Sequence, residues 1–306
     1  MTAERFGYDT PVAFRAALKE HFAQIARADG RYPLHELQRQ FAYDRALARL
    51  FSSDNADRWV LKGAGALLAR LATARHSKDI DVLFEVSDAD VDDAVEALLA
   101  ALRDDLGDHF RFEVTRVAPL QQEAKGARVH VNTRLGPTLF AAFHIDVVVA
   151  GVMTGRPDLV APLTPLVIDG LVRPRYRVFP VADHLADKLC AAVGTYARVA
   201  DPVGSTRVKD LVDIAIIATS QTVSAGDLTV AVRVNAAARR LLLPDRFAVP
   251  DPIGWGRRYP RIASQAPGLA PDYETAATLA GLLFDPVLGA TATGAWDPAT
   301  RTWVAQ

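Results

Sequence analysis

The stretch VLKGAGALLARLATARHSKDIDVLF, residues 60–84, decides the fold. Its first apolar residues, together with Trp59, predict a short strand, and the glycines that follow predict a tight turn. The amphipathic segment Ala66–Ala74 predicts a helix, and alternating apolar residues predict a second strand over Ile80–Val86. A strand, a glycine turn, a helix and a second strand are the beginning of an α/β core.

The glycine turn, KGAG, is the first candidate binding site. Backbone N–H groups at the start of a helix bind phosphate, and glycine lets a phosphate approach the backbone closely. The residues expected to contact a nucleotide are Lys62, Gly63, Ala64 and Gly65. A purely structural turn is the alternative, because Leu68 stands where a dinucleotide-binding fingerprint has its third glycine.

Two aspartates stand on one face of the second strand. Asp79 and Asp81 alternate with apolar residues, so both carboxylates point away from the core, about 6–7 Å apart. Carboxylates at this separation repel each other unless a cation lies between them, and their oxygens suit Mg²⁺ or Mn²⁺. The alternative is a pair of solvated acids at the start of an edge strand.

A third carboxylate, Asp146, interrupts the later apolar stretch FHIDVVVA. The apolar residues around it share one face of the strand predicted over Thr138–Val149, which places Asp146 on the other face. An unpaired acid is costly in so apolar a strand. We expect Asp146 to complete a metal site with Asp79 and Asp81, and the alternative is a salt-bridged or edge-exposed carboxylate.

The other predicted elements complete a mixed sheet flanked by helices and a mainly helical C-terminal part, an α/β (α+β) class. Helices are predicted over 11–28, 34–51, 87–107, 181–196, 205–219, 227–242 and 273–284, and strands over 110–117, 127–134, 138–149, 166–172 and 175–179. Ser87 is the expected N-cap of its helix, and the Pro- and Gly-rich stretch 241–260 is predicted to be a structured loop. We expect two domains, a core over 1–180 and a second domain over 181–306.

This order of motifs resembles a known enzyme family. A glycine turn opening a helix, Asp-x-Asp on a strand and a lone Asp on a later strand resemble the nucleotidyltransferase fold of the DNA polymerase β superfamily. Downstream, FPVADHLADKLCAAVGTYAR (179–198) resembles the lysine-containing helix of the AbiEii/MenT nucleotidyltransferase toxins, and RVKDLVDIAII (207–217) resembles their Asp-Leu-x-Asp segment. One departure is Ala64, where the family usually has Ser, Gly or Thr, so no hydroxyl is available there.

The resemblance implies that Lys188 and Asp210 are catalytic together with Asp79 and Asp81. Lys188 would neutralise the triphosphate of an NTP, and Asp210 would orient Lys188 or a substrate hydroxyl. The alternatives are a lysine that extends to solvent and an aspartate that pairs with a basic neighbour on its own helix. Two further residues expected near the phosphates are Ser77 and Lys78.

The resemblance also implies a biological role. The acceptor would be a tRNA 3′ end, and the protein would be a toxin that is blocked by a cognate antitoxin protein. Two other hypotheses remain open at this point. One is a nucleotidyltransferase that modifies a small molecule or a protein, and the other is a non-catalytic protein that binds a nucleotide or a partner.

Composition limits the other classes of function. Half of the 306 residues are hydrophobic and 23% are charged, as in a globular protein, and the single cysteine excludes an intramolecular disulfide framework. The N-terminal residues lack the apolar core of a signal peptide, and no run of 18 apolar residues occurs, so we expect a cytoplasmic protein without a membrane partner. Because the formal net charge is -1, RNA binding requires a local basic face.

Basic residues gather in places that are candidates for such a face, with a solvated surface as the alternative. These residues are Arg173, Arg175 and Arg177; Arg198, Arg207 and Lys209; and Arg257, Arg258 and Arg261 with Trp255 and Tyr259 available for stacking. The histidines show no metal-ligand spacing, and no chemistry is assigned to them. They include His76, His130, His144 and His184.

Overall fold

The computed structural model of the chain describes residues 6–29, 33–71, 74, 79–120, 125–149, 151–164, 166–197, 202–204, 207–266 and 271–305. The chain divides into two compact units. The first comprises Met1–Ala72, His76–Gly151 and Asp158–Val178, and the second comprises Thr73–Arg75, Val152–Pro157 and Phe179–Gln306. Each unit has its own set of buried apolar side chains.

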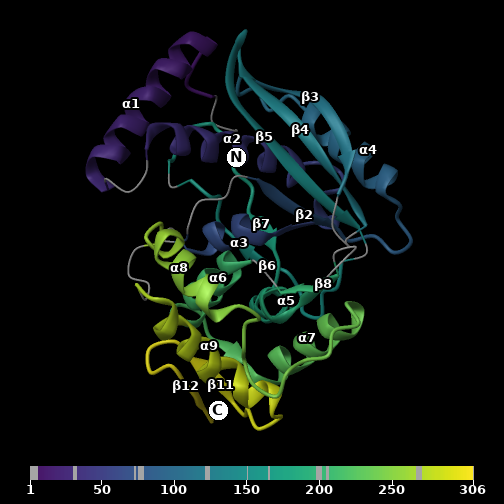
Figure 1. Cartoon of the computed structure of the whole chain (residues 1–306). Helices are drawn as coiled ribbons and strands as arrows, with labels where there is room; N and C mark the ends of the chain where they lie inside the picture. The colour runs from purple at the N-terminus through teal and green to yellow at the C-terminus, as the bar shows by residue number, and fades with distance from the viewer. Residues whose placement is uncertain are drawn as a thin grey trace. The chain divides into compact units, whose positions relative to one another are not determined.

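The first unit is built around a seven-stranded mixed sheet with the strand order β3-β4-β5-β2-β1-β7-β6 (Figure 1). Its strands are β1 (Trp59–Lys62), β2 (Ile80–Phe84), β3 (Phe110–Pro119), β4 (Gly126–Leu135), β5 (Thr138–Val149), β6 (Asp158–Val160) and β7 (Tyr176–Val178). β2 runs antiparallel to β1 and parallel to β5, and β4 pairs antiparallel with both β3 and β5. The predicted α/β class with a mixed sheet flanked by helices is confirmed.

Two helices of the first unit cover one face of the three-stranded end of the sheet. The described helices are α1 (Pro11–Asp29), α2 (Leu34–Leu50), α3 (Gly63–Arg70) and α4 (Val91–Arg103). α2 packs against β5, and α4 packs against β3, β4 and β5. Along β4, odd-numbered residues such as Val129 and Val131 are buried, whereas the even-numbered residues are half-exposed. The sheet β3-β4-β5 therefore has one covered face and one open face.

α4 begins later than the sequence predicts, because Asp90 rather than Ser87 is its N-cap. The Asp90 carboxylate accepts a hydrogen bond from the backbone N–H of Asp93 at 2.9 Å, and the Asp93 carboxylate accepts one from the N–H of Asp90 at 3.1 Å. This reciprocal arrangement satisfies two N–H groups that the helix itself leaves without partners. Leu98 and Leu102 of the predicted apolar stripe are buried, as expected.

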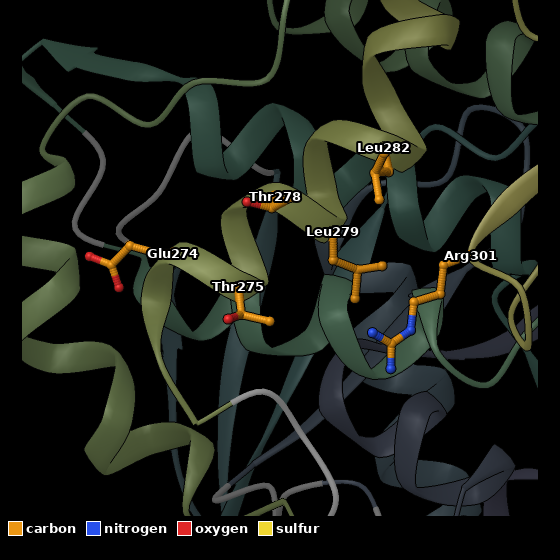
Figure 2. Close-up of a pocket in the computed structure, with 6 residues that line it drawn as sticks. All are labelled: Glu274, Thr275, Thr278, Leu279, Leu282 and Arg301. Carbon is orange, nitrogen blue, oxygen red and sulfur yellow. The ribbon is translucent and has the colours of Figure 1, made fainter.

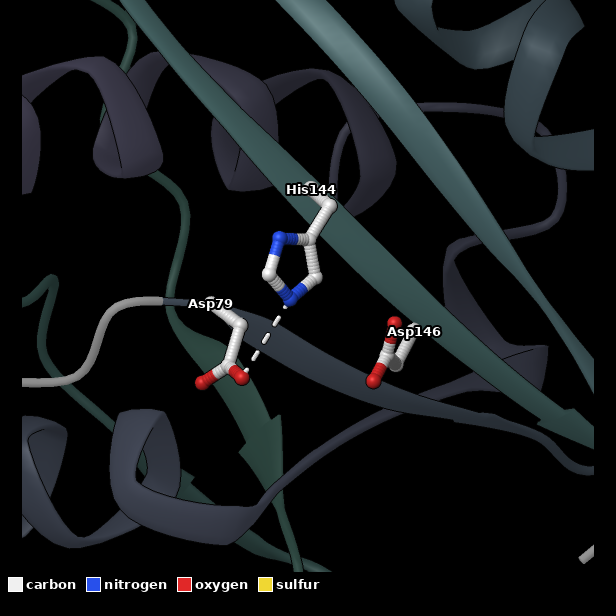
Figure 3. Close-up of side chains that lie close together, drawn as sticks. All are labelled: Asp79, His144 and Asp146. Carbon is white, nitrogen blue, oxygen red and sulfur yellow. Dashed lines mark ion pairs between the residues drawn. The ribbon is translucent and has the colours of Figure 1, made fainter. Parts of the chain in front are cut away.

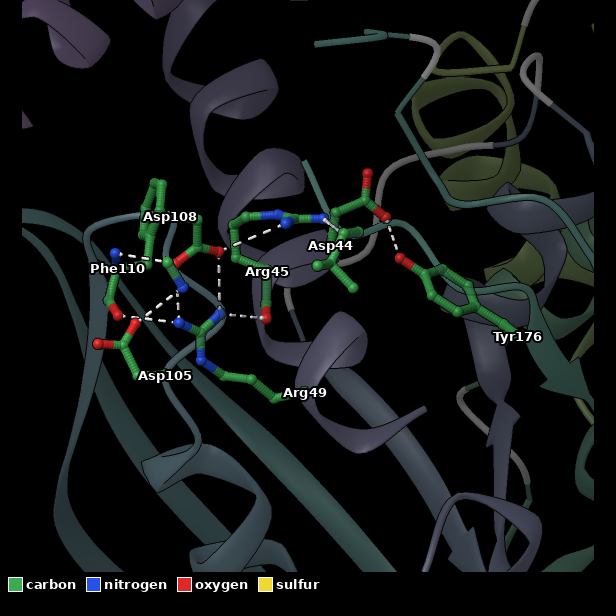
Figure 4. Close-up of polar contacts among 9 residues, drawn as sticks. Asp44, Arg45, Arg49, Asp105, Asp108, Phe110 and Tyr176 are labelled. Atoms are coloured by element: carbon green, nitrogen blue, oxygen red, sulfur yellow. Dashed lines mark hydrogen bonds and ion pairs between the residues drawn. The ribbon is translucent and has the colours of Figure 1, made fainter. Parts of the chain in front are cut away.

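A buried ion cluster fixes α2 to the start of β3 (Figure 4). Arg49 Nη2 donates to Asp108 Oδ1 at 2.8 Å, and Arg45 Nη1 lies 3.4 Å from Asp108 Oδ2. All three side chains are at most 1% exposed. Burial opposes ionisation of Asp108, but the hydrogen bond and charge of Arg49, with the charge of Arg45, hold its pKa below the usual value. One carboxylate thus compensates two buried cations.

The segment 166–172, which the sequence predicts to be extended, contains no strand and includes a turn at Asp169–Gly170. The chain just before it is held to α2 instead. Asp44 accepts hydrogen bonds from the N–H groups of Leu163 and Thr164 at 2.8 and 2.7 Å. It also accepts one from the Tyr176 hydroxyl at 2.6 Å (Figure 4).

The second unit is mainly helical. Its described helices are α5 (Val181–Val193), α6 (Val208–Ala218), α7 (Ala225–Ala238), α8 (Pro252–Ala263) and α9 (Tyr273–Leu288). Its strands are β8 (Thr195–Ala197) with β9 (Pro202–Gly204), and β10 (Val223–Ser224) with β11 (Ala295–Asp297) and β12 (Thr302–Val304). α6 packs against α5, α8 and α9, and its last turn accepts a hydrogen bond from Trp296 Nε1 at the Ala218 carbonyl, at 2.7 Å.

The prediction of a loop over 241–260 is wrong in its second half, where α8 forms. Asp251 caps this helix by accepting a bond from the N–H of Gly254 at 2.9 Å, and Pro252 suits the first helical position. Trp255 and Tyr259 are fully buried in the structure. They are therefore core residues, and the expectation that they are available for stacking on a nucleic acid is also wrong.

None of the described helices is both long and apolar enough to cross a membrane.

Asp108→Ala is expected to lower the free energy of unfolding by about 3–5 kcal/mol, because it leaves two arginines buried without a counter-charge. The half-exposed pair of Glu113 and Arg134, 2.7 Å apart, offers a matched control. Glu113→Ala should cost under about 1 kcal/mol. Chemical denaturation followed by circular dichroism measures both, and equal losses in the two variants would show that the buried cluster does not stabilise the fold.

Candidate active site

The parallel pairing of β2 with β5 brings the predicted carboxylates together. Ile80 pairs with Ile145, and Asp81 pairs with Asp146. Side chains alternate along a strand, so Asp79 and Asp81 on one strand share a face with His144 and Asp146 on its neighbour. Residues far apart in the sequence therefore form one polar row across two adjacent strands.

His144 joins this row as a possible ligand. Its Nε2 lies 3.4 Å from Asp79 Oδ2, and the two side chains point toward each other in Figure 3. Asp79, His144 and Asp146 each offer one ligand atom, and these atoms all lie within 4.8 Å of one another. His144 Nε2 is buried and makes no hydrogen bond to the described part of the chain. The Nε2 of His144 thus lies beside two carboxylates, as in a site for a divalent cation.

Asp146 is held by an arginine that the sequence did not single out. Arg128 on β4 donates to both of its oxygens, through Nε to Oδ1 and Nη2 to Oδ2, each at 2.7 Å. The hydrogen bond with Asp146 raises the pKa of Arg128 above its usual value. The salt-bridged alternative for Asp146 is therefore correct as a description of its contacts. Each carboxylate oxygen keeps a second lone pair, so the bidentate bond orients Asp146 without excluding a cation.

The glycine turn lies against the other predicted ligand, Asp81. Gly63 has a φ of 59°, and a Cβ added there would stand 2.0 Å from Asp81 Oδ2. Only glycine allows the Asp81 carboxylate to lie this close to the backbone. Lys62 pairs with Asp81 in the register of β1 and β2 and is also the N-cap of α3. The helix α3 starts at Gly63, earlier than predicted. The N–H groups of the KGAG glycines therefore belong to the first helical turn of α3.

Lys188 lies in a cluster of its own within the second unit. Its Nζ is 2.8 Å from Asp210 Oδ1 and 2.9 Å from Asp213 Oδ2, and the residue is 5% exposed. The alternative in which Lys188 extends to solvent is therefore wrong. Arg207 Nε lies 2.7 Å from Asp210 Oδ2, so Asp210 pairs both with Lys188 and, as the other alternative held, with a basic neighbour. The ammonium is fixed between two buried carboxylates.

Some predicted residues are not described by the structure: Ser77 and Lys78, like His76 and Arg198, lie outside the described residues. The arginines of the 173–177 segment bind main-chain carbonyls: Arg173 that of Thr164, Arg175 that of Leu159 and Arg177 that of Trp59. These contacts hold loops and strand ends together, so the segment is not a free basic row.

Two other features carry no chemistry that we can assign. A hollow of about 290 Å³ lies along α9 and is lined by Glu274, Thr275, Thr278, Leu279, Leu282 and Arg301 (Figure 2). It brings together no pair of carboxylates. Cys190 is buried, and burial raises the pKa of its thiol to about 11, so it is not a thiolate nucleophile at neutral pH.

A family model described as the nucleotidyl transferase AbiEii toxin of a type IV toxin–antitoxin system matches residues 45–281. This span covers most of the chain, so the chain belongs to this family and is a nucleotidyltransferase. The resemblance noted from the sequence motifs is thereby confirmed, and the family implies an antitoxin partner.

Two solved structures from Helicobacter pylori are similar to the chain, each with 15% sequence identity. One, JHP933, has a TM-score of 0.43 and covers 84% of this chain and 89% of its own. The other, titled as a candidate nucleotidyltransferase, has a TM-score of 0.40 and covers 81% of this chain and 88% of its own. No curated protein sequence matches the chain.

Gly63→Ala is expected to lower nucleotide transfer by about 10²-fold, because the new Cβ displaces the Asp81 carboxylate and an error of about 1 Å in a catalytic group costs that much. Gly256→Ala on α8 is the matched control, since no atom of the described part of the chain lies within 4 Å of a Cβ added there. We expect its activity to stay near that of the wild type. The measurement is transfer of label from α-labelled NTPs to the acceptors of a cell extract. Equal activity of the two variants would contradict a functional contact between Gly63 and Asp81.

Proposed function

We propose that the protein transfers NMP from an NTP to the 3′-terminal hydroxyl of a tRNA and thereby acts as a toxin in the cytoplasm. The observation that carries this proposal is the row of Asp79, Asp81 and Asp146 on paired strands, with the Gly63 turn directly against Asp81. A turn that can bind phosphate beside clustered carboxylates is the arrangement that NTP-dependent transfer needs. The family supports the class of reaction, and the sequence resemblance supports the acceptor.

The residues fit a divalent cation, Mg²⁺ or Mn²⁺. Asp79 and Asp146 would supply oxygen ligands and His144 Nε2 a nitrogen ligand, since these three groups cluster in the structure. Asp81, which pairs with Asp146 in the strand register, stays a predicted fourth ligand. When bound, such an ion neutralises charge on the α-phosphate and on the leaving pyrophosphate.

The chain's own groups would position the substrate rather than form a covalent intermediate. Gly63, Ala64 and Gly65 would hold phosphate oxygens through their N–H groups, with Lys62 beside them; Ser77 and Lys78 keep the same assignment as a prediction. The acceptor oxygen would bond to the α-phosphorus, the bond to the bridging oxygen of pyrophosphate would break, and the hydroxyl proton would pass to solvent. Positioning and charge neutralisation account for catalysis of this kind.

Lys188 and Asp210 keep the catalytic roles that the resemblance implies. Lys188 would bind a phosphate of the NTP. Its two carboxylate partners, Asp210 and Asp213, hold the ammonium in one place. Exchange of one of these carboxylate contacts for a phosphate contact would let the lysine bind the substrate.

Purified protein incubated with each α-labelled NTP and total tRNA is expected to label tRNA at its 3′ end. Asp81→Ala should lower incorporation by about 10²-fold or more, because it removes a preorganised charge at the reacting phosphate. Asp92→Ala is a matched control, since it removes an exposed aspartate of another Asp-x-Asp pair, on α4. Label that enters only protein or small-molecule fractions would contradict the tRNA acceptor, and full activity of Asp81→Ala would contradict the site.

A further inference from the structure

The open face of the sheet β3-β4-β5 continues directly from the carboxylate row. Arg128, His130 and Asn132 alternate along β4 and are half-exposed on this face. The strand register pairs Arg128 with Asp146, His130 with His144, and Asn132 with Ala142 on β5. The polar row of the active site therefore extends outward onto β4.

A hollow of about 250 Å³ lies on this face and is bordered by His144 itself. Its lining residues are Thr115, His130, Val131, Asn132, Ala142, Phe143 and His144. The rings of His130 and His144 are 5.8 Å apart between centroids and tilted by 47°. A β-bulge between Val114 and Arg116 leaves Thr115 as an extra residue, and bulges of this kind re-aim side chains beside active sites.

The chemistry of this hollow suits a nucleoside. Imidazole rings stack on nucleobases, and the amide of Asn132 and the hydroxyl of Thr115 both donate and accept hydrogen bonds. No carboxylate is among the lining residues, so the hollow is not a second cation site. Its volume is below the usual range for drug-sized ligands, which fits one nucleoside rather than a larger structured group.

The same face is basic around the hollow. Arg111 and Arg116 on β3 are exposed, and Arg111 stands opposite Arg134 in the register with β4. Like charges directly opposite each other destabilise a sheet unless an anion lies between them. Glu113 pairs with Arg134. The guanidinium of Arg111, which stands opposite Arg134, is therefore the candidate phosphate contact.

The position of the hollow relative to the glycine turn fixes which substrate it would hold. In the sheet, β2 and β5 with their carboxylates lie between β1, which leads into the Gly63 turn, and β4, which borders the hollow. In phosphoryl transfer the attacking and leaving oxygens lie roughly in line on opposite sides of the phosphorus. If the leaving pyrophosphate lies at the Gly63 turn, the attacking hydroxyl comes from the side of the hollow.

From this geometry we infer that the open face of β3-β4-β5 is the acceptor site. The 3′-terminal nucleoside of a single-stranded RNA end occupies the hollow, with its base against His130 and His144, and the preceding phosphates contact Arg111 and Arg116. The inference rests on the proposed function for the identity of the reaction, and it adds where the acceptor binds and what chemistry selects it.

Binding of a labelled RNA oligonucleotide with the sequence of a tRNA 3′ end, measured by fluorescence anisotropy without NTP, tests the inference independently of transfer. Arg111→Ala and Arg116→Ala should each weaken binding and lower the slope of log affinity against log salt by about 0.7. The matched control is Arg233→Ala on α7, an exposed arginine of the second unit. Absence of RNA binding by the wild type, or equal binding by all these variants, overturns the inference.

The terminal nucleoside is tested with a second oligonucleotide whose last residue lacks its base. Loss of that base should weaken binding to the wild type by about fivefold or more and should cost His130→Ala nothing further. His35→Ala, an exposed histidine of α2, is the control and should respond like the wild type. Circular dichroism confirms that each variant is folded. An equal cost of base removal in the wild type and in His130→Ala overturns the placement in the hollow.

Steady-state kinetics separates this inference from the proposed function. His130→Ala should raise the KM for RNA and leave the KM for NTP unchanged. A raised KM for NTP with an unchanged KM for RNA would place the incoming nucleotide in the hollow and overturn the acceptor assignment. RNA binding through this face without any transfer of NMP to RNA would reject the proposed acceptor reaction and leave the RNA-binding face in place.

Discussion

The parallel pairing of β2 with β5 is the constraint on which the candidate active site depends. It sets Asp81 beside Asp146 and leaves Asp79 and His144 next to each other at the same end. A slip of one residue would turn Asp146 to the opposite face, because side chains alternate along a strand. Parallel neighbours cannot be joined by a tight turn, and α4 with the β3-β4 hairpin provides the connection between them. The buried apolar residues of both strands fix this register.

A cluster of carboxylates is unfavourable by itself, and the structure shows two ways in which the cost is limited. Arg128 holds Asp146 through two short hydrogen bonds, so one negative charge is already compensated. Gly63 gives Asp81 room directly against the backbone at the start of α3, where the helix dipole favours a negative charge. Both contacts orient the carboxylates. Lys188, between Asp210 and Asp213, is the corresponding buried cation of the second unit.

The sequence predicts best what depends on neighbouring residues. The strand alternation at Asp79 and Asp81 and the glycine turn are local patterns, and both are found where they were expected. Arg128 could not be found in this way, because its partner Asp146 is 18 residues away and meets it only through the register of β4 and β5. His144 left a weak signal, since it precedes Asp146 by two residues and therefore shares its strand face. The helix α8 was missed because its proline and glycines suggest a loop, although Asp251 and Pro252 form a regular start.

Binding of Mn²⁺, followed by electron paramagnetic resonance of the free ion, tests most directly whether β2 and β5 build one metal site. If they do, Asp79→Asn and Asp146→Asn, on different strands, each weaken Mn²⁺ binding by about tenfold or more, since loss even of a residue that only supports a ligand costs that much. Asp92→Asn, at an exposed position of α4, should bind as the wild type does. Unchanged Mn²⁺ affinity in both Asp79→Asn and Asp146→Asn would contradict the metal site and the catalytic arrangement built on it.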